Sequence, residues 1–203
     1  MLDLGERIRG TQRDLGRSIL VGISGVDCAG KSTLAELLAA ERPDSTLVLP
    51  GDEMTRPSRE REDYRESFDY AQVFTDVRDA VLINEARTLT LRMTDWENDR
   101  WRLEQVDFLP DAVVIVEGCF LFTPLSTGVF DIAIWIDLPL DQVVERAVRR
   151  PRDLARMGGE EGVRRRYAER YLPAQYRHLT QDRPQERADI VVPASLPFAD
   201  LAQ

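Results

Sequence analysis

The stretch that decides the fold is Ser18–Ser32, which reads SILVGISGVDCAGKS. Its first half, residues 18–24, is a β-branched and apolar run before Gly25, and such a run is typical of a buried central strand in a parallel sheet. Residues 31–40 are good helix formers. The octet Gly25–Ser32 between them fits G-x-x-x-x-G-K-[ST], the pattern of phosphate-binding loops that join a strand to a helix. The stretch therefore predicts a strand, a phosphate-binding loop and a helix in this order.

We expect this loop to hold the phosphates and Mg²⁺ of a bound ATP. Glycines let the backbone amides face inward, and the N-terminus of the following helix adds a positive dipole. Lys31, the only lysine among 27 basic residues, would neutralise charge on the transferred group, while Ser32 would offer its hydroxyl to Mg²⁺. The predicted nucleotide-binding residues are Gly25, Val26, Asp27, Cys28, Ala29, Gly30, Lys31, Ser32 and Thr33, with Arg152 from later in the chain.

Outward from the loop, short apolar runs alternate with helical patterns. The further strands are predicted at 46–49, 112–116, 132–136 and 190–192, and the further helices at 73–89, 141–150 and 160–180, the last interrupted at Pro173. This alternation favours an α/β fold with a doubly wound parallel sheet, whose ligands bind at the carboxyl ends of the strands. We predict one domain over residues 1–203, of the P-loop NTPase type, with a charged surface segment at 56–69, a hairpin or substrate lobe at about 88–108 and a lid at about 149–162. Within the lid, 151–159 is predicted as a basic loop.

The composition limits the classes of partner. The chain has 203 residues and a formal net charge of −9, which disfavours an extended nucleic-acid groove. It lacks a run of roughly 18 apolar residues, which a membrane-spanning helix needs, and we expect a cytoplasmic protein. Cys28 and Cys119 form no metal-binding pattern and are expected to be reduced structural thiols, and His178 is expected at the surface. The oligomeric state is left open, self-association included.

The presence of a single lysine and of two carboxylates after strands indicates which class of P-loop protein this is. A guanine-binding N-K-x-D motif needs a second lysine, and no LSGGQ-like transporter signature occurs. Small-molecule kinases remain, and they need a carboxylate near the acceptor hydroxyl and another near the metal. Asp52 follows the second strand and is predicted to be the general base; Glu117 follows the 112–116 strand. Ser32, Asp52 and Glu117 are the candidate ligands of Mg²⁺.

Arginines gather at the end of the 141–150 helix and in the lid, where they could clamp phosphate oxygens. Arg150 and Arg156 are predicted to be catalytic, Arg152 to bind the nucleotide, and Arg146 to contact the substrate. Trp96 could stack on a ring of the acceptor.

The sequence resembles the uridine kinase and phosphoribulokinase-like family of P-loop kinases over residues 19–193. GISGVDCAGKSTLA is similar to the opening of the family, VVIVEG to its strand with a following glutamate, and ERADIVVP to its closing strand. Phe68-Asp69, with Phe74 six residues after Phe68, is similar to its F-D-x-P-x-x-F motif. The resemblance implies that Asp52 is the base, that Ser32 and Glu117 serve the metal, and that Asp69 holds the ribose hydroxyls. It also places Tyr167 near the nucleoside.

The segment that recognises the pyrimidine in this family has a different sequence here. The family's Tyr-Asp-Phe-x-x-His is matched here by residues 94–99, TDWEND, which lack the histidine, and Thr55 stands where the family has a tyrosine after the base. We therefore expect a small-molecule kinase that uses ATP and Mg²⁺ to phosphorylate the 5′-hydroxyl of a nucleoside. The alternatives are another hydroxyl acceptor, such as nicotinamide riboside, pantothenate or a sugar phosphate, and a non-catalytic ATP-binding module.

Overall fold

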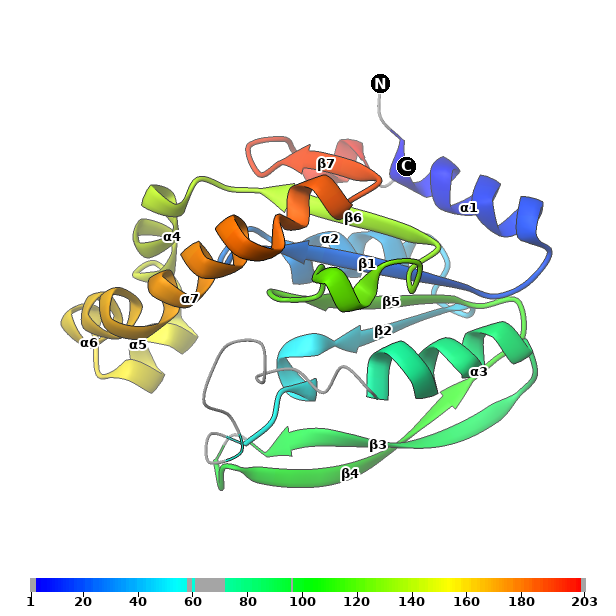
Figure 1. The fold of residues 1–203 in the computed structure, drawn as a ribbon, viewed down its shortest axis with the longest axis horizontal. Coiled ribbons are helices and arrows are strands. Elements are labelled where there is room, and N and C mark those ends of the chain that lie inside the picture. The colour runs from blue at the N-terminus through cyan, green and yellow to red at the C-terminus, as the bar shows by residue number, and fades with distance from the viewer. Residues whose placement is uncertain (1–2, 58–59, 61–71, 96, 202–203) are drawn as a thin grey trace.

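The computed structural model describes residues 3–57, 60, 72–95 and 97–201 of the chain. Its centre is a five-stranded sheet in the order β2-β5-β1-β6-β7, with every neighbouring pair parallel (Figure 1). The strands are β1 (Ile19–Gly25), β2 (Thr46–Pro50), β5 (Val113–Gly118), β6 (Ile132–Asp137) and β7 (Ile190–Pro193). The predicted doubly wound parallel sheet and its five strands are confirmed.

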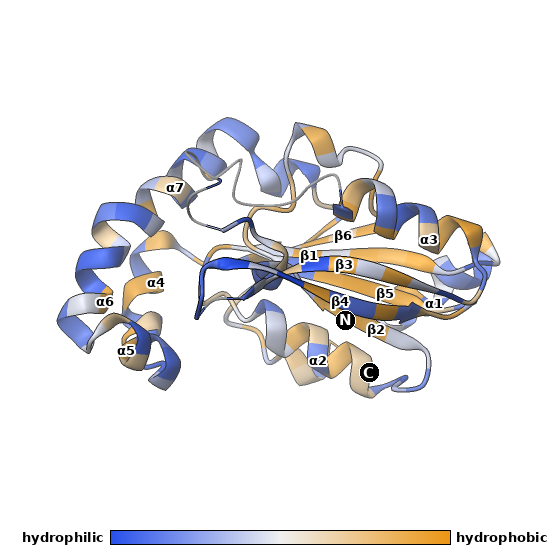
Figure 2. Ribbon diagram, turned by 90° about the horizontal axis from the view of Figure 1, so that it is seen from below, coloured by the Kyte–Doolittle hydropathy of each residue, from blue (hydrophilic) through white to orange (hydrophobic). Residues whose placement is uncertain are grey.

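Helices cover both faces of this sheet. Helix α2 (Lys31–Ala40) lies on one face, whereas α3 (Arg78–Ile83) and the end of the last helical run lie on the other (Figure 2). Residues of β1, β5 and β6 are almost all buried, as expected for strands of a parallel sheet that is covered on both faces. The hydrophobic strands and the apolar sides of the helices thus form one core that fixes the ends of the strands.

The register of the strands brings the functional segments together. Glu117 of β5 lies beside Ile23 of β1 and beside Pro50 of β2. Because the strands are parallel, the loop after β1, the turn after β2 and the end of β5 all emerge at the same edge. The turn is a short 3₁₀ helix, η1 (Gly51–Met54), and it carries Asp52.

A hairpin below the sheet is formed by β3 (Arg87–Asp95) and β4 (Arg100–Phe108), which pair antiparallel. This confirms the hairpin expected at about 88–108 but corrects the helix predicted over 73–89. The helical segment consists of a π-helical turn, η4 (Gln72–Val77), followed by α3. It ends at Asn84, which has a left-handed backbone with φ of 53°, and Thr88 and Thr90 beyond it favour a strand.

A helical arm stands at the carboxyl ends of the strands (Figure 1). It contains α4 (Leu140–Ala147), α5 (Pro151–Met157), α6 (Glu160–Arg166) and α7 (Leu172–Arg177), with π-helical segments at Tyr167–Tyr171 and His178–Asp182. The stretch predicted as a basic loop is therefore mostly the helix α5. Pro151 suits the first turn of a helix, and Gly158, with φ of 79°, ends it in the left-handed region. Pro173 lies in the first turn of α7, directly after a π-helical segment.

Two further features were not predicted. Helix α1 (Leu4–Leu15) begins at Asp3, which accepts a hydrogen bond from the Glu6 amide at 2.7 Å, and it buries Leu4 and Ile8. His178 was expected at the surface but is only 1% exposed. Its ring packs edge-on against Phe120, and its Nδ1 lies 2.9 Å from Asp182.

The remaining short 3₁₀ helices are η5 (Pro124–Ser126), η8 (Pro184–Arg187) and η9 (Phe198–Asp200). Within the described ranges, no helix is both long enough and apolar enough to span a bilayer.

Candidate functional site

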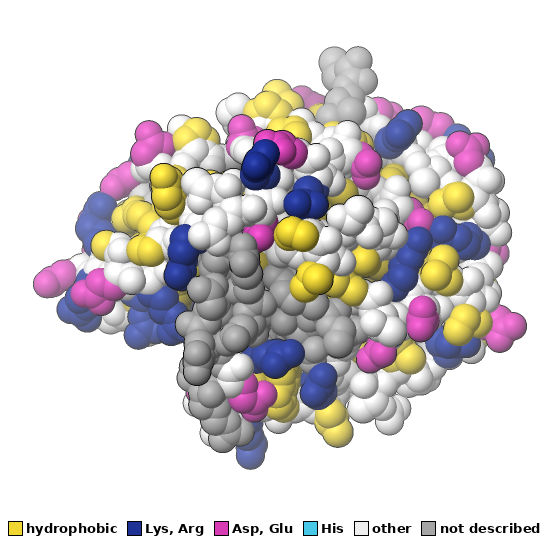
Figure 3. All heavy atoms as spheres, in the orientation of Figure 1, with side chains coloured by type: hydrophobic (Ala, Val, Ile, Leu, Met, Phe, Trp, Pro, Cys, Tyr) yellow, Lys and Arg dark blue, Asp and Glu magenta, His cyan; other side chains and the backbone are white. Residues whose placement is uncertain are grey.

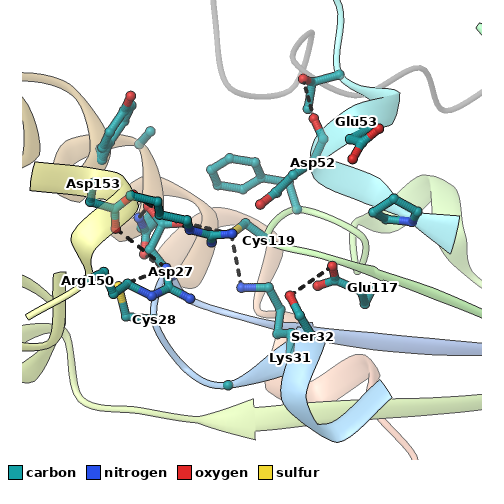
Figure 4. A pocket seen from close by; sticks show the side chains of 18 of the residues that line it. Asp27, Cys28, Lys31, Ser32, Asp52, Glu53, Glu117, Cys119, Arg150 and Asp153 are labelled. Carbon is teal, nitrogen blue, oxygen red and sulfur yellow. Dashed lines mark hydrogen bonds and ion pairs between the residues drawn. The ribbon is translucent and has the colours of Figure 1, made fainter. Parts of the chain in front are cut away.

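A cavity of about 810 Å³ opens at the carboxyl edge of the sheet. Its wall contains residues of the phosphate-binding loop, of η1, of the segment after β5 and of the helical arm (Figure 4). This is the position at which open parallel sheets bind ligands, and a volume of this size accommodates a drug-sized ligand.

The phosphate-binding loop between β1 and α2 has the curled backbone that its sequence requires. Cys28 and Gly30 have positive φ of 62° and 101°. A Cβ atom at Gly30 would lie 2.5 Å from the ring of Phe198 in η9, so glycine is needed there for space as well as for conformation. Alternation of backbone conformations of this kind turns amide groups toward a common centre and forms an anion-binding nest.

Lys31 begins α2 and is 7% exposed. Its ammonium donates to the Val26 carbonyl at 2.9 Å and to the Cys119 sulfur at 3.2 Å. Burial alone would lower the pKa of Lys31, but neighbouring acidic groups, Cys119 first and then Asp52, outweigh burial and raise its pKa. Lys31 is therefore a buried, permanent cation, which is what binding of a polyphosphate requires.

Ser32 and Glu117 form a second polar pair in the cavity wall. The Ser32 hydroxyl donates to Glu117 Oε1 at 3.1 Å. Glu117 is 4% exposed, and its other oxygen, Oε2, is buried with no hydrogen-bond partner in the described part of the chain. Burial raises the pKa of Glu117, with Lys31 acting against it and Asp52 adding to it.

This pair fits Mg²⁺. A serine hydroxyl and a carboxylate oxygen are hard ligands, and an oxygen without a hydrogen-bond partner can serve the ion directly or through water. No cluster of three or more His, Cys, Asp or Glu side chains able to hold a metal occurs within the described ranges. In a phosphotransferase, phosphates and water complete the coordination of Mg²⁺.

Asp52 lies across the cavity from Lys31, in the turn after β2 (Figure 4). Its side chain is exposed to the cavity, but the surrounding protein desolvates it and raises its pKa. Lys31 acts against this shift and Asp27 adds to it. A carboxylate placed here can accept a proton from a hydroxyl group that enters the cavity.

Comparison with known proteins agrees with this geometry. No protein-family model matches the chain. The chain is 26% identical over 181 residues to a uridine kinase of Borrelia hermsii, which covers 86% of this chain and 85% of that protein. It is also 26% identical over 190 residues to a uridine kinase of Proteus mirabilis, with 86% of each covered.

The fold matches solved kinase structures. A structure assigned to a fructose transport system kinase of Silicibacter sp. TM1040 superposes with a TM-score of 0.74, at 23% identity over 95% of this chain and 100% of that one. One assigned to a uridine kinase of Bacillus stearothermophilus gives 0.63, at 22% identity over 93% and 98%. The chain has the fold of P-loop kinases and is similar in sequence to uridine kinases. A D-glycerate 3-kinase of Cryptococcus neoformans shares the fold, with a TM-score of 0.63 and 12% identity over 94% of each chain.

The arm of this kinase brings arginines to the cavity. Arg150, Arg152 and Arg156 all line it, and Arg150 and Arg152 lie 3.7 and 3.9 Å from oxygens of Asp153. Figure 3 shows basic side chains gathered at this end of the molecule. In an acidic protein, such a cluster gives the arm a local positive charge that suits a nucleotide.

The other site residues predicted from sequence differ in whether they line the cavity. Of the loop, Asp27, Cys28, Gly30, Lys31 and Ser32 line the cavity, whereas Gly25, Val26, Ala29 and Thr33 are not among the lining residues. Tyr167 lines it, but Arg146 does not and instead donates to the carbonyls of Cys28 and Ala194 at 3.2 and 3.3 Å. Asp69, Trp96 and most of the 56–69 segment lie outside the described residues.

Some lining residues were missed. Cys119 was taken as a structural thiol, although it directly follows β5, which ends at Gly118, and that position could have signalled it. Gln175 is a buried polar side chain of α7 that bonds to the loop. Its polar helix resembles a solvent-facing one in sequence, so no signal distinguished it. Missed residues of the cavity wall also include Glu53, Phe120 and Arg177.

Proposed function

We propose that this kinase transfers the γ-phosphoryl group of ATP to the 5′-hydroxyl of a nucleoside. Relatives that are 26% identical are named uridine kinases, which supports a nucleoside as the acceptor. The observation that carries the proposal is the position of Asp52 in the cavity. A carboxylate of raised pKa faces Lys31 across one cavity, so a general base and a phosphate-binding loop share the same space.

The chemistry follows from these positions. A bond forms between the acceptor oxygen and the γ-phosphorus while the bond from that phosphorus to the ADP oxygen breaks. Asp52 takes the proton of the acceptor hydroxyl, and Lys31 stabilises the charge on the transferred group. Ser32 and Glu117 would hold Mg²⁺, which supplies charge neutralisation of the phosphates when it is bound.

The arginines of the arm are assigned to the phosphates. Arg150 and Arg156 would stabilise the transferred group, and Arg152 would bind the nucleotide, because their planar groups can bind two oxygens at once. We keep residues 149–162 as the proposed lid and 88–108 as the proposed substrate lobe within one domain.

The proposed acceptor contacts include residues of several segments. Asp69 would hold the ribose hydroxyls and Trp96 would stack on the base. Tyr167, which lines the cavity, would add a further contact, and Arg146 would support the phosphate-binding loop through its hydrogen bond to the Cys28 carbonyl. We further propose that the kinase works in the cytoplasm, binds no nucleic acid or membrane, and can self-associate.

A second candidate function is phosphorylation of another hydroxyl compound, and the buried position of Thr94 favours it. This residue stands where the family has the tyrosine of its pyrimidine segment, but it is 2% exposed and its hydroxyl donates to the Thr55 carbonyl. The two positions expected to contact a pyrimidine therefore bond to each other. Nicotinamide riboside, pantothenate and sugar phosphates are the acceptors to compare.

The test is replacement of Asp52 by asparagine, with ADP release measured in the presence of candidate acceptors. Loss of the general base should lower kcat by about 10²–10⁴-fold. Glu53→Gln is the comparison variant. This neighbouring carboxylate also lines the cavity but pairs with Arg102 of β4 at 2.5 Å, so its replacement should lower turnover far less than Asp52→Asn does. If Asp52→Asn turns over as fast as the unmodified chain, the proposal is wrong.

A further inference from the structure

The tip of the phosphate-binding loop, Asp27 and Cys28, is held by the helical arm. The arm contacts Cys28 through Arg150, whose guanidinium lies 3.4 Å from the sulfur, and through Tyr167, whose hydroxyl lies 3.8 Å from it. The contact to Asp27 is made by Gln175 of α7, which is 2% exposed. The loop and the arm are thus joined directly, side by side in the cavity wall.

Gln175 makes both of its contacts to one residue. Its Oε1 accepts from the Asp27 backbone amide at 2.9 Å, and its Nε2 donates to Asp27 Oδ2 at 2.8 Å. We name this pair of hydrogen bonds the clasp. Its polarity is fixed, because a carboxylate only accepts and the amide must present its NH₂ group to that carboxylate.

The clasp continues to Lys31. The Cys119 thiol donates to Asp27 Oδ1 at 2.9 Å and accepts from the Lys31 ammonium at 3.2 Å. Burial raises the pKa of Cys119 well above its ordinary value, so the sulfur stays a neutral thiol that can donate and accept at once. A continuous chain of hydrogen bonds therefore runs from α7 through the loop to Lys31.

We propose that Gln175 and Asp27 are positioning residues for nucleotide binding, which fix the tip of the phosphate-binding loop to the arm and set the resting place of Lys31. Tyr171 and Ala174 of the same helical run line the cavity, so a movement of the arm is passed to the loop through the clasp. The inference rests on the proposed function only in that the loop binds a nucleotide.

The polarity of the clasp provides the test. In Asp27→Asn, one carboxylate acceptor becomes an NH₂ group that must face either Gln175 Nε2 or the Cys119 thiol, both donors. In Gln175→Glu, two carboxylates face each other. In the double variant, the new amide at position 27 can donate through its NH₂ group to the new carboxylate at position 175, while the oxygen of that amide accepts from Cys119. The double variant also conserves the net charge of the chain.

The measurement is the Kd of MgADP by calorimetry for the four proteins of this cycle, with the melting temperature of each. Each single variant should weaken MgADP binding about tenfold, and the double variant should return to within about threefold of the unmodified chain. Tyr176→Phe is the control, because this neighbouring side chain is 61% exposed, and its Kd should not change.

A double variant that binds MgADP no better than the weaker single variant overturns the inference. So does a double variant that regains its melting temperature but not its affinity, since the clasp would then act on stability alone. MgADP binding needs no acceptor, so the outcome is independent of whether the proposed acceptor is phosphorylated.

Discussion

At the centre of the cavity, one lysine faces several carboxylates. Lys31 has Asp27, Asp52 and Glu117 among the groups that raise its pKa, and it lowers in turn the otherwise raised pKa values of Asp52 and Glu117. Without a nucleotide, the single positive charge of Lys31 is shared among these carboxylates. A bound polyphosphate would compete for Lys31 and leave Asp52 more basic, which suits its proposed role.

The pH dependence of the reaction follows from Asp52. Burial raises its pKa above the ordinary value of about 3.9 for aspartate, and the base must be ionised to accept a proton. We therefore expect kcat/KM for the acceptor to fall as the pH is lowered through a pKa above about 3.9. The pH profile should be recorded with circular dichroism over the same range, to separate titration from unfolding.

Glu53→Gln should show the same fall of kcat/KM at low pH, the acid limb of the profile, as the unmodified chain. An acid limb at or below the ordinary aspartate value, in protein that stays folded, would show that Asp52 is not the group whose ionisation limits the rate.

Single residues differed in how far the sequence could place them. The pair Ser32 and Glu117 was predicted because a motif and the end of a strand each have a fixed position relative to the sheet. Gln175 and His178 were not, because a polar residue in a charged helix gives no sign of whether it faces solvent or the interior. Their burial depends on how the arm packs, which local sequence does not encode.

At the scale of elements, an ion-pair network ties the amino ends of the strands together. Asp131, just before β6, pairs with Arg17 at 2.9 Å and with Arg78 of α3 at 2.8 Å, and it accepts from the Leu20 amide at 2.8 Å. Its side chain is 6% exposed. Burial alone would raise the pKa of Asp131, but these hydrogen bonds outweigh burial and lower it.

Replacing Asp131 by asparagine should destabilise the fold. Two partly buried guanidinium groups, of Arg17 and Arg78, would lose their anion, which costs on the order of 3 kcal/mol in the free energy of unfolding. Chemical denaturation at pH 7 measures this, with Asp14→Asn as the control, since this exposed aspartate of α1 should change stability by less than about 0.5 kcal/mol.

The same variant has a defined pH dependence. A carboxyl group whose pKa is lowered by folding stabilises the fold above its unfolded pKa of about 3.9, and this contribution is lost as the pH falls through the lower folded value. The difference between the unmodified chain and Asp131→Asn should therefore be full at pH 7 and shrink in this acidic range. An equal difference at all pH values would contradict the ion-pair account.

Elements were predicted well where their pattern was strong. The five core strands were found because their apolar runs are short, rich in β-branched residues and bounded by turn residues, which favours buried strands over helices. The arm was predicted less well. Pro151 and two adjacent glycines, Gly158 and Gly159, suggested a loop, whereas Pro151 starts α5 and Gly158 ends it. The same residues that break helices also delimit them, and composition alone does not separate the two uses.

At the scale of the whole molecule, the sheet and the arm form two walls of one cavity. The carboxyl ends of β1, β2 and β5 supply the lysine, the serine and the carboxylates, and α5 to α7 supply arginines from the other side (Figures 1 and 4). Solved structures of this fold include proteins named for uridine, fructose and D-glycerate. Because these proteins are named for different compounds, the fold alone does not identify the acceptor, which depends on the side chains that line this particular cavity.

The central claim is that this chain phosphorylates a hydroxyl group of a small molecule. The most direct test is mass spectrometry of the products after incubation with ATP, Mg²⁺ and a pool of nucleosides, vitamins and sugar phosphates. We predict one compound that gains a single phosphoryl group, in an amount equal to the ADP formed, with a nucleoside 5′-phosphate as the product. ADP release without any phosphorylated acceptor, or no ADP release at all, would contradict the claim.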